Sequence, residues 1–179
     1  TIEAGDTLEI RATIAVGNWG PAVTLTNVRF NDTIPANTTY IPGSLKILTN
    51  EGLEWRAFTD ANDGDQGRRN GNYIRINMGS TYNNNNPGSV NLGSAPPNDA
   101  GTGGNSGGRI QHNGRPSFYG GICIMSASYR IVVNTTLNYG DIINMYGGAF
   151  RYRESGTDIV RALPPYTISL TENIGLCNN

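Results

Sequence analysis

The sequence is short of charged residues, and this shortage excludes one broad class of partner. Only 15% of its 179 residues are Asp, Glu, Lys or Arg, and the formal net charge is −1. The thirteen basic residues are scattered along the chain, with Arg68 and Arg69 as the one adjacent pair. Nucleic-acid binding relies on clustered Lys and Arg side chains that displace counterions from phosphates. We therefore expect no nucleic-acid partner.

Membrane-spanning segments and a disulfide framework are missing as well. No run of apolar residues approaches the roughly 20 that a membrane-spanning helix needs, so we expect no membrane insertion. Two cysteines, Cys123 and Cys177, are too few for a disulfide framework in a chain of this length. They leave two alternatives open, a Cys123–Cys177 bridge or two free thiols.

Residue patterns for catalysis are also missing. The single histidine, His112, lies in a Gly-rich stretch, and no G-x-S-x-G motif accompanies it to build a catalytic triad. One histidine far in sequence from both cysteines does not make a zinc site. The 14 Asp and Glu residues show no local pattern that selects a glycosidase pair. We expect a protein that is not an enzyme, and we interpret His112 as a surface-loop residue.

Glycine, asparagine, threonine and serine take the place of the missing charges, and these residues favour turns over helices. Two segments alternate apolar and polar residues over a long distance, residues 8–16 and residues 122–133. A period of two residues is typical of strands that bury one face. Shorter strands are expected at residues 28–30, 38–41, 45–48, 74–78, 141–152 and 166–170, and we expect Asn31-Asp32 to end the first of these. About eight short antiparallel strands separated by turn signals predict an all-β sandwich or barrel.

The segment from residue 79 to residue 121 differs from the rest of the chain. It contains eleven glycines and the run Asn83-Asn84-Asn85-Asn86, and it has almost no apolar residues. Such a segment buries too little surface to offset its ordering entropy. We expect a long polar loop between two core strands, with a recognition loop and a tolerated insertion as the open alternatives. The expected organisation is one β-sandwich domain over residues 1–172, followed by a tail or linker over residues 173–179.

Four short motifs occur in order within the first 50 residues. They are Gly5-Asp6 before a strand, Asn18-Trp19-Gly20-Pro21 in a turn, Asp32-Thr33-Ile34-Pro35 at a strand end, and Gly43-Ser44 further along. In this order they resemble the DUF11 repeat domain, which occurs in tandem in secreted and cell-wall proteins of bacteria and archaea. Residues 139–144 are similar to the closing strand of that family. The resemblance covers residues 1–50 and 120–170, while the middle of the chain is long for the family.

The resemblance implies an Ig-like β-sandwich that serves as a structural or adhesive module and has no known catalysis. It also implies a secreted or cell-surface location. The partners it implies are neighbouring modules of the same chain, with glycans or surface proteins as further partners. The sandwich expected from the residue pattern agrees with this fold.

One acidic loop has the composition of a cation site. Residues 60–67 read Asp-Ala-Asn-Asp-Gly-Asp-Gln-Gly, which alternates carboxylate and amide oxygens around a glycine. Ca²⁺ collects roughly six to eight oxygen ligands, and such a site would stabilise the module. The candidate calcium ligands are Asp60, Asn62, Asp63 and Asp65. The spacing departs from an EF-hand loop, because no Glu stands at the twelfth position, and the alternative is a solvated Asx-turn without a metal.

Aromatic residues offer a second kind of ligand site. Trp19 and Trp55 are candidates for stacking against a sugar ring, as in carbohydrate-binding β-sandwiches, and further candidates are Tyr73, Tyr82, Phe118 and Tyr119. Aromatic residues in a sandwich more often fill the core or pair across strands. Carbohydrate binding is therefore the alternative to a structural or adhesion module.

Overall fold

Strands form where apolar and polar residues alternate, and every paired strand is antiparallel to its partner. The computed structural model describes residues 1–16, 23–48, 54–61, 67–78, 108–112 and 123–171. These residues form thirteen strands and no helix. The fold is therefore the all-β sandwich that the sequence predicts, with more strands than the eight expected. None of these segments is a helix that could cross a membrane.

The first sheet, sheet A, is built around the long strand β9 (Cys123–Val133). β1 (Thr7–Val16) pairs with one edge of β9 along its whole length. The other edge of β9 takes two short strands in turn, β3 (Thr38–Tyr40) and β4 (Lys46–Leu48), and β4 also pairs with β5 (Glu54–Ala57). The two long alternating segments of the sequence are thus direct partners.

The second sheet, sheet B, is built in the same way around β2 (Val23–Thr33). One edge of β2 pairs with β11 (Ala149–Glu154), and β11 also pairs with the edge strand β12 (Thr157–Ala162). The other edge of β2 pairs with β8 and then with β7, and β6 pairs with β7. These three strands span Gly108–His112 for β8, Tyr73–Asn77 for β7 and Gly67–Asn70 for β6.

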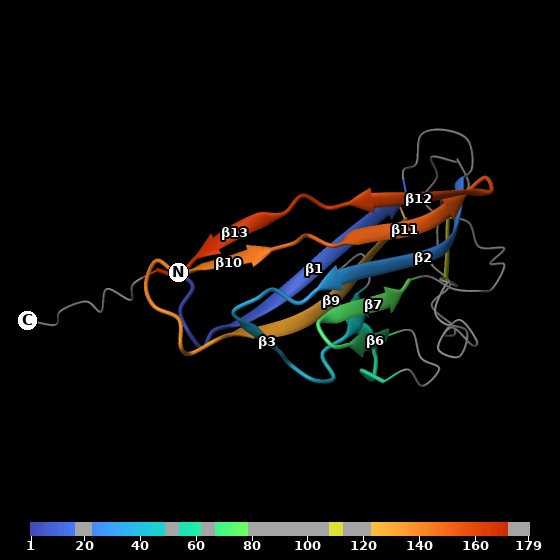
Figure 1. Ribbon diagram of the computed structural model, residues 1–179. Helices are drawn as coiled ribbons and strands as arrows, with labels where there is room; N and C mark the ends of the chain where they lie inside the picture. The colour runs from blue at the N-terminus through green and yellow to red at the C-terminus, as the bar shows by residue number, and fades with distance from the viewer. Residues whose placement is uncertain (17–22, 49–53, 62–66, 79–107, 113–122, 172–179) are drawn as a thin grey trace, which may run out of the picture.

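A two-stranded ribbon extends the β11–β12 hairpin. β10 (Ile142–Met145) and β13 (Tyr166–Ser169) pair with each other and continue the line of β11 and β12 (Figure 1). Between the two halves the chain bends at Gly147 and Gly148, whose φ angles are +80° and +65°. The strand expected at residues 141–152 is therefore two strands separated by this bend.

The two sheets enclose one hydrophobic core, and a buried hydrogen bond joins them across it. The hydroxyl of Tyr129 in β9 donates to Asp32 Oδ2 in β2 at 2.8 Å. The rings of Phe30 and Phe150 pack 5.3 Å apart beside it, within sheet B. The core draws on both sheets, with Leu25, Val28, Phe30, Ile74, Ile76 and Phe150 from sheet B and Ala127, Tyr129, Ile131 and Val133 from sheet A.

Four strands were not expected from the sequence: β5, β6, β8 and β12. β8 lies inside the segment expected to be a polar loop, and His112 is the last residue of this strand, opposite Val23, rather than a loop residue. β2 also continues through Asn31-Asp32 to Thr33. The strand does not end at Asp32 because this side chain is buried against Tyr129 instead of turning the chain.

Candidate functional site

Asp60, a predicted calcium ligand, is bound to both sheets by hydrogen bonds. The hydroxyl of Tyr40 in β3 donates to Asp60 Oδ1, and the Gly43 N–H donates to Oδ2 at 3.0 Å. The Arg69 N–H in β6 donates to the Asp60 carbonyl at 2.8 Å. The Arg69 guanidinium lies 4.9 Å from the centre of the Tyr40 ring. Burial, and then the hydrogen bond to Asp60, raise the pKa of Tyr40 to about 12.

The other predicted site residues are placed only in part. Trp19, Asn62, Asp63, Asp65 and Cys177 lie outside the described residues. Trp55 lies in β5, and Cys123 begins β9. The calcium site, sugar stacking by the two tryptophans and the Cys123–Cys177 bridge stay predictions. In the part of the chain that the structure describes, no three His, Cys, Asp or Glu side chains gather into a metal-binding group.

A groove that the sequence did not predict lies on the outer face of sheet B. Phe30 and Asp32 of β2 are buried in the core, so the alternation of the strand places Asn31 and Thr33 on its outer side. Tyr73 of β7 is paired with Thr33 across the sheet. These residues border a hollow of about 210 Å³, which we call the tyrosine groove. Its lining includes Asn31, Thr33, Tyr73, Tyr146, Ala149 and Arg151.

The side chains of the tyrosine groove combine aromatic faces with hydrogen-bonding groups. Tyr73 is 45% exposed and Tyr146 is 49% exposed, so each presents ring surface and a hydroxyl to solvent. Asn31 Oδ1 is buried at the groove and has no hydrogen-bond partner among the described residues. A buried acceptor without a partner is uncommon in folded proteins, and a donor that reaches it stabilises the structure. The exposed guanidinium of Arg151 adds a fixed positive charge.

Asp32 also lines the tyrosine groove, and its hydrogen bonds fix the strand that carries the groove. Its Oδ2 accepts the hydrogen bond from Tyr129, and its Oδ1 accepts one from the Thr33 N–H at 2.7 Å. Burial raises the pKa of Asp32, and the hydrogen bonds from Tyr129 and Thr33 act against this rise. Burial, and then the nearby Asp32 carboxyl, also raise the pKa of Tyr129. The pair therefore has a structural role between the two sheets.

Gly148 sets the shape of the groove next to Tyr146. A Cβ at this position would lie 2.6 Å from the Asn31 carbonyl oxygen, 2.9 Å from the Phe30 ring and 3.0 Å from Asp32 Cγ. The left-handed φ at the bend also favours glycine. The chain after β10 can therefore approach β2 closely because residue 148 has no side chain.

A second cavity, of about 240 Å³, lies between the sheets beside β1. Most of its lining is apolar, including Ile10, Phe30, Met145 and Leu163. Asp32 is the one acidic residue among the described residues that line it. A glycosidase mechanism needs two carboxyl groups facing one cleft, and this cavity does not supply them.

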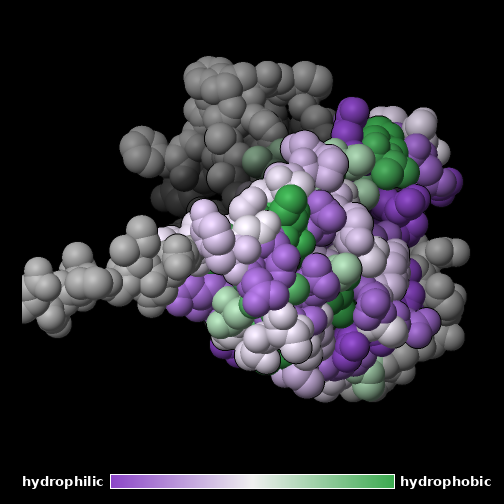
Figure 2. Space-filling view, turned by 60° about the vertical axis from the view of Figure 1, so that its left-hand side comes forward, coloured by the Kyte–Doolittle hydropathy of each residue, from purple (hydrophilic) through white to green (hydrophobic). Residues whose placement is uncertain are grey.

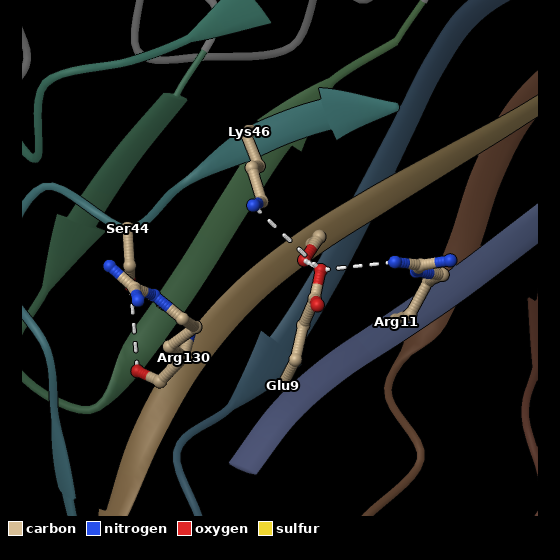
Figure 3. Close-up of polar contacts among 6 residues, drawn as sticks. Glu9, Arg11, Ser44, Lys46 and Arg130 are labelled. Carbon is tan, nitrogen blue, oxygen red and sulfur yellow. Dashed lines mark hydrogen bonds and ion pairs between the residues drawn. The ribbon is translucent and has the colours of Figure 1, made fainter. Parts of the chain in front are cut away.

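The outer face of sheet A uses its charges to link strands. Figure 3 shows Glu9 of β1 between Arg11 and Lys46, with Oε1 3.4 Å from the Arg11 guanidinium and 4.0 Å from Lys46 Nζ. The Ser128 hydroxyl in β9 donates to the same oxygen. This hydrogen bond is the main reason that the pKa of Glu9 is lowered, and the two cations act in the same direction. These contacts join β1, β4 and β9, and they leave Glu9 in a structural role.

The surface of the molecule is largely hydrophilic where Figure 2 draws the described residues. Hydrophobic residues form separate spots there rather than one continuous patch. Isolated exposed apolar residues are normal for a soluble surface. The tyrosine groove differs from such isolated residues, because its two exposed tyrosines border a hollow that polar side chains also line.

Comparison with known proteins gives distant structural similarities. No protein-family model and no curated protein matches the sequence, so the resemblance to DUF11 stays a prediction. The N-terminal domain of an adhesin from Streptococcus gordonii superposes with a TM-score of 0.43 and 9% identity, over 94% of this chain and 29% of that one. The collagen-binding domain of a Staphylococcus aureus adhesin superposes with a TM-score of 0.37 and 12% identity, over 92% of this chain and 88% of that one.

A family 123 glycoside hydrolase from Clostridium perfringens gives a TM-score of 0.31 and 14% identity, over 94% of this chain and 22% of that one. This chain thus spans less than a third of the hydrolase and of the Streptococcus gordonii adhesin domain. All three similarities are low in superposition and in sequence identity. None of them decides the ligand or the activity of this chain, which must be argued from its own residues.

Proposed function

We propose that this chain is a non-catalytic extracellular adhesion module that contacts its ligand through the tyrosine groove. The observation that carries the proposal is the pair of half-exposed tyrosines, Tyr73 and Tyr146, beside an amide and a guanidinium on one sheet face. Exposed tyrosine and arginine side chains are enriched where proteins bind partners, because they combine apolar contact area with hydrogen bonds.

The contacts of three carboxyl groups, Asp32, Glu9 and Asp60, support binding over catalysis. Asp32 is bound by Tyr129, and Glu9 is bound by Ser128. Asp60 is bound by Tyr40 and by a backbone N–H. Each of these groups links one strand or sheet to another, whereas a hydrolase places two such groups toward one substrate.

The strand pairing supports a role in which the groove stays fixed under load. The groove draws residues from β2, β7 and β11, which are neighbours in sheet B. Backbone hydrogen bonds between strands therefore set the position of most of the lining, while Tyr146 lies in the short connection between β10 and β11. The extracellular location and the neighbouring modules of the same chain rest on the four motifs that resemble DUF11.

The proposal is tested by binding of the purified chain to plates coated with extracellular-matrix proteins and to an array of glycans. We expect binding to at least one probe, and we expect Tyr73→Ala combined with Tyr146→Ala to abolish it. Tyr139→Ala is the matched control, because Tyr139 is 72% exposed and does not line the groove. Thermal melts of all variants establish that they are folded.

Two results would contradict the proposal. One is that the double variant binds as well as the wild type, which would place the contact surface elsewhere. The other is that the bound glycan or protein is cleaved during incubation, which chromatography of the recovered probe detects. Cleavage would identify the chain as an enzyme.

A further inference from the structure

The tyrosine groove is adjacent to a second hollow on the outer face of sheet B. This second hollow has a volume of about 160 Å³, and its lining includes Asn27, Arg29, Asp158 and Val160. Arg151 lines both hollows, so its side chain lies between them. Each hollow is smaller than the roughly 300–1,000 Å³ of a pocket for a drug-sized molecule. The two hollows together suit neighbouring units of a chain-like ligand.

Two arginines, Arg29 and Arg151, and two carboxyl groups, Asp32 and Asp158, line these two hollows. The Asp32 side chain is buried and accepts the hydrogen bond from Tyr129, so the exposed cation at the tyrosine groove is Arg151. Arg29 of β2 and Arg151 of β11 are directly opposite each other in the strand register. Like charges in opposite positions disfavour strand pairing unless other groups offset them. Asp158 lies beside the second hollow, but its carboxylate is 3.2 Å from Arg153 Nε and is neutralised by it. Arg151 forms no ion pair with any described residue.

We propose that the tyrosine groove and the neighbouring hollow bind an anionic oligosaccharide, a ligand class that rests on the proposed adhesion function. One sugar ring stacks on Tyr73 and Tyr146, whose ring faces contact its C–H groups and whose hydroxyls bind its hydroxyls. A carboxylate or sulfate on the same or the next unit is bound by the guanidinium of Arg151, which matches the planar geometry of such anions. Asn31 supplies an amide to a sugar hydroxyl at the floor of the groove.

The test measures calorimetric binding of four probes to the full chain. The probes are an oligogalacturonate, its methyl ester, a sulfated dextran oligosaccharide and the unsulfated one. We expect the wild type to bind at least one acidic probe at least about ten-fold more tightly than its neutral counterpart, since a charge-assisted hydrogen bond accounts for such a factor. Which acidic probe binds distinguishes a carboxylate ligand from a sulfate ligand.

Arg151→Gln should weaken the acidic complex about ten-fold and remove most of its salt dependence. Arg130→Gln is the control, because Arg130 is exposed on the outer face of the other sheet (Figure 3), and it should leave affinity unchanged. Equal binding of acidic and neutral probes would overturn the anionic ligand class, and so would an Arg151→Gln variant with unchanged affinity. In either case the adhesion function would still stand if the tyrosine double variant loses binding. Binding to matrix proteins without binding to any oligosaccharide would overturn this inference alone. No binding to any probe would overturn both.

Discussion

Asp32 is a carboxyl group buried between two sheets, and its proton affinity affects how stability depends on pH. Burial raises the pKa of Asp32 above its ordinary value of 3.8. At a pH between 3.8 and the pKa of the folded state, the folded protein therefore holds the proton more often than the unfolded chain does. The contribution of protonated Asp32 is therefore complete below pH 3.8 and is lost as pH rises through the folded pKa. Relative to Asp32→Asn, we expect the wild-type free energy of unfolding to fall by about 1.4 kcal/mol for each unit of the pKa difference.

Urea unfolding of both proteins at several pH values between about 3 and 7 measures this difference. Glu9→Gln provides a control of opposite sign, because the pKa of Glu9 is lowered from 4.5 and its contribution is present above that value and lost in acid. A wild-type curve that runs parallel to the Asp32→Asn curve would show that Asp32 titrates alike in both states.

At the scale of elements, the bend between β10 and β11 depends on Gly148. Gly148→Ala places a methyl group 2.6 Å from the Asn31 carbonyl oxygen in a backbone conformation with φ of +65°. We expect a loss of about 2–5 kcal/mol of stability, from backbone strain of about 1–2 kcal/mol and overpacking of about 1–3 kcal/mol. Gly156→Ala separates the two contributions, because φ is +84° at Gly156 and a Cβ there meets nothing within 4 Å. Equal losses in the two variants, measured by urea unfolding, would show that the close approach has no energetic consequence.

The sequence predicted the elements that carry their own pattern. β1 and β9 alternate over ten and eleven residues, and this pattern predicted each of them as a long strand. β6 reads Gly-Arg-Arg-Asn, and β12 exposes nearly all of its residues, so neither has a buried stripe to reveal it. Such strands form because a neighbour supplies the hydrogen bonds, and this is tertiary information that a local pattern lacks.

At the scale of the whole molecule, the candidate site depends on pairing between distant segments. Tyr73 lies in β7 and Tyr146 lies in the connection between β10 and β11. Both border the same hollow because β7 and β11 pair with opposite edges of β2. Nothing local in the sequence marks Tyr146 or Arg151, and Asn31-Asp32 suggested a strand end rather than a groove floor. Tyr73 was a stacking candidate by residue type alone. The fold class was thus predictable from the sequence, while the groove required the strand register.

The predicted calcium site would act at the scale of the whole molecule, because a loop that binds an ion only in the folded state stabilises the entire sandwich. Asp60 begins the acidic loop and hydrogen-bonds to both sheets, so an ion at this loop would be coupled to global unfolding. We expect the thermal midpoint to rise between excess EDTA and millimolar CaCl₂, with about 2.7 kcal/mol of added stability at a hundredfold excess over the dissociation constant.

Asp63→Ala should remove this shift while leaving the melt in EDTA unchanged, since it deletes a predicted ligand and none of the bonds that hold Asp60. Tyr40→Phe is the complementary variant: it deletes the hydroxyl that binds Asp60 and keeps the ring under Arg69. It should lower the midpoint under both conditions and preserve most of the calcium shift, because it loosens the attachment of the loop without removing an oxygen ligand. Coincident wild-type melts in EDTA and CaCl₂ would show that the acidic loop binds no calcium. The loop would then be a hydrogen-bonded turn in which Asp60 has a structural role alone.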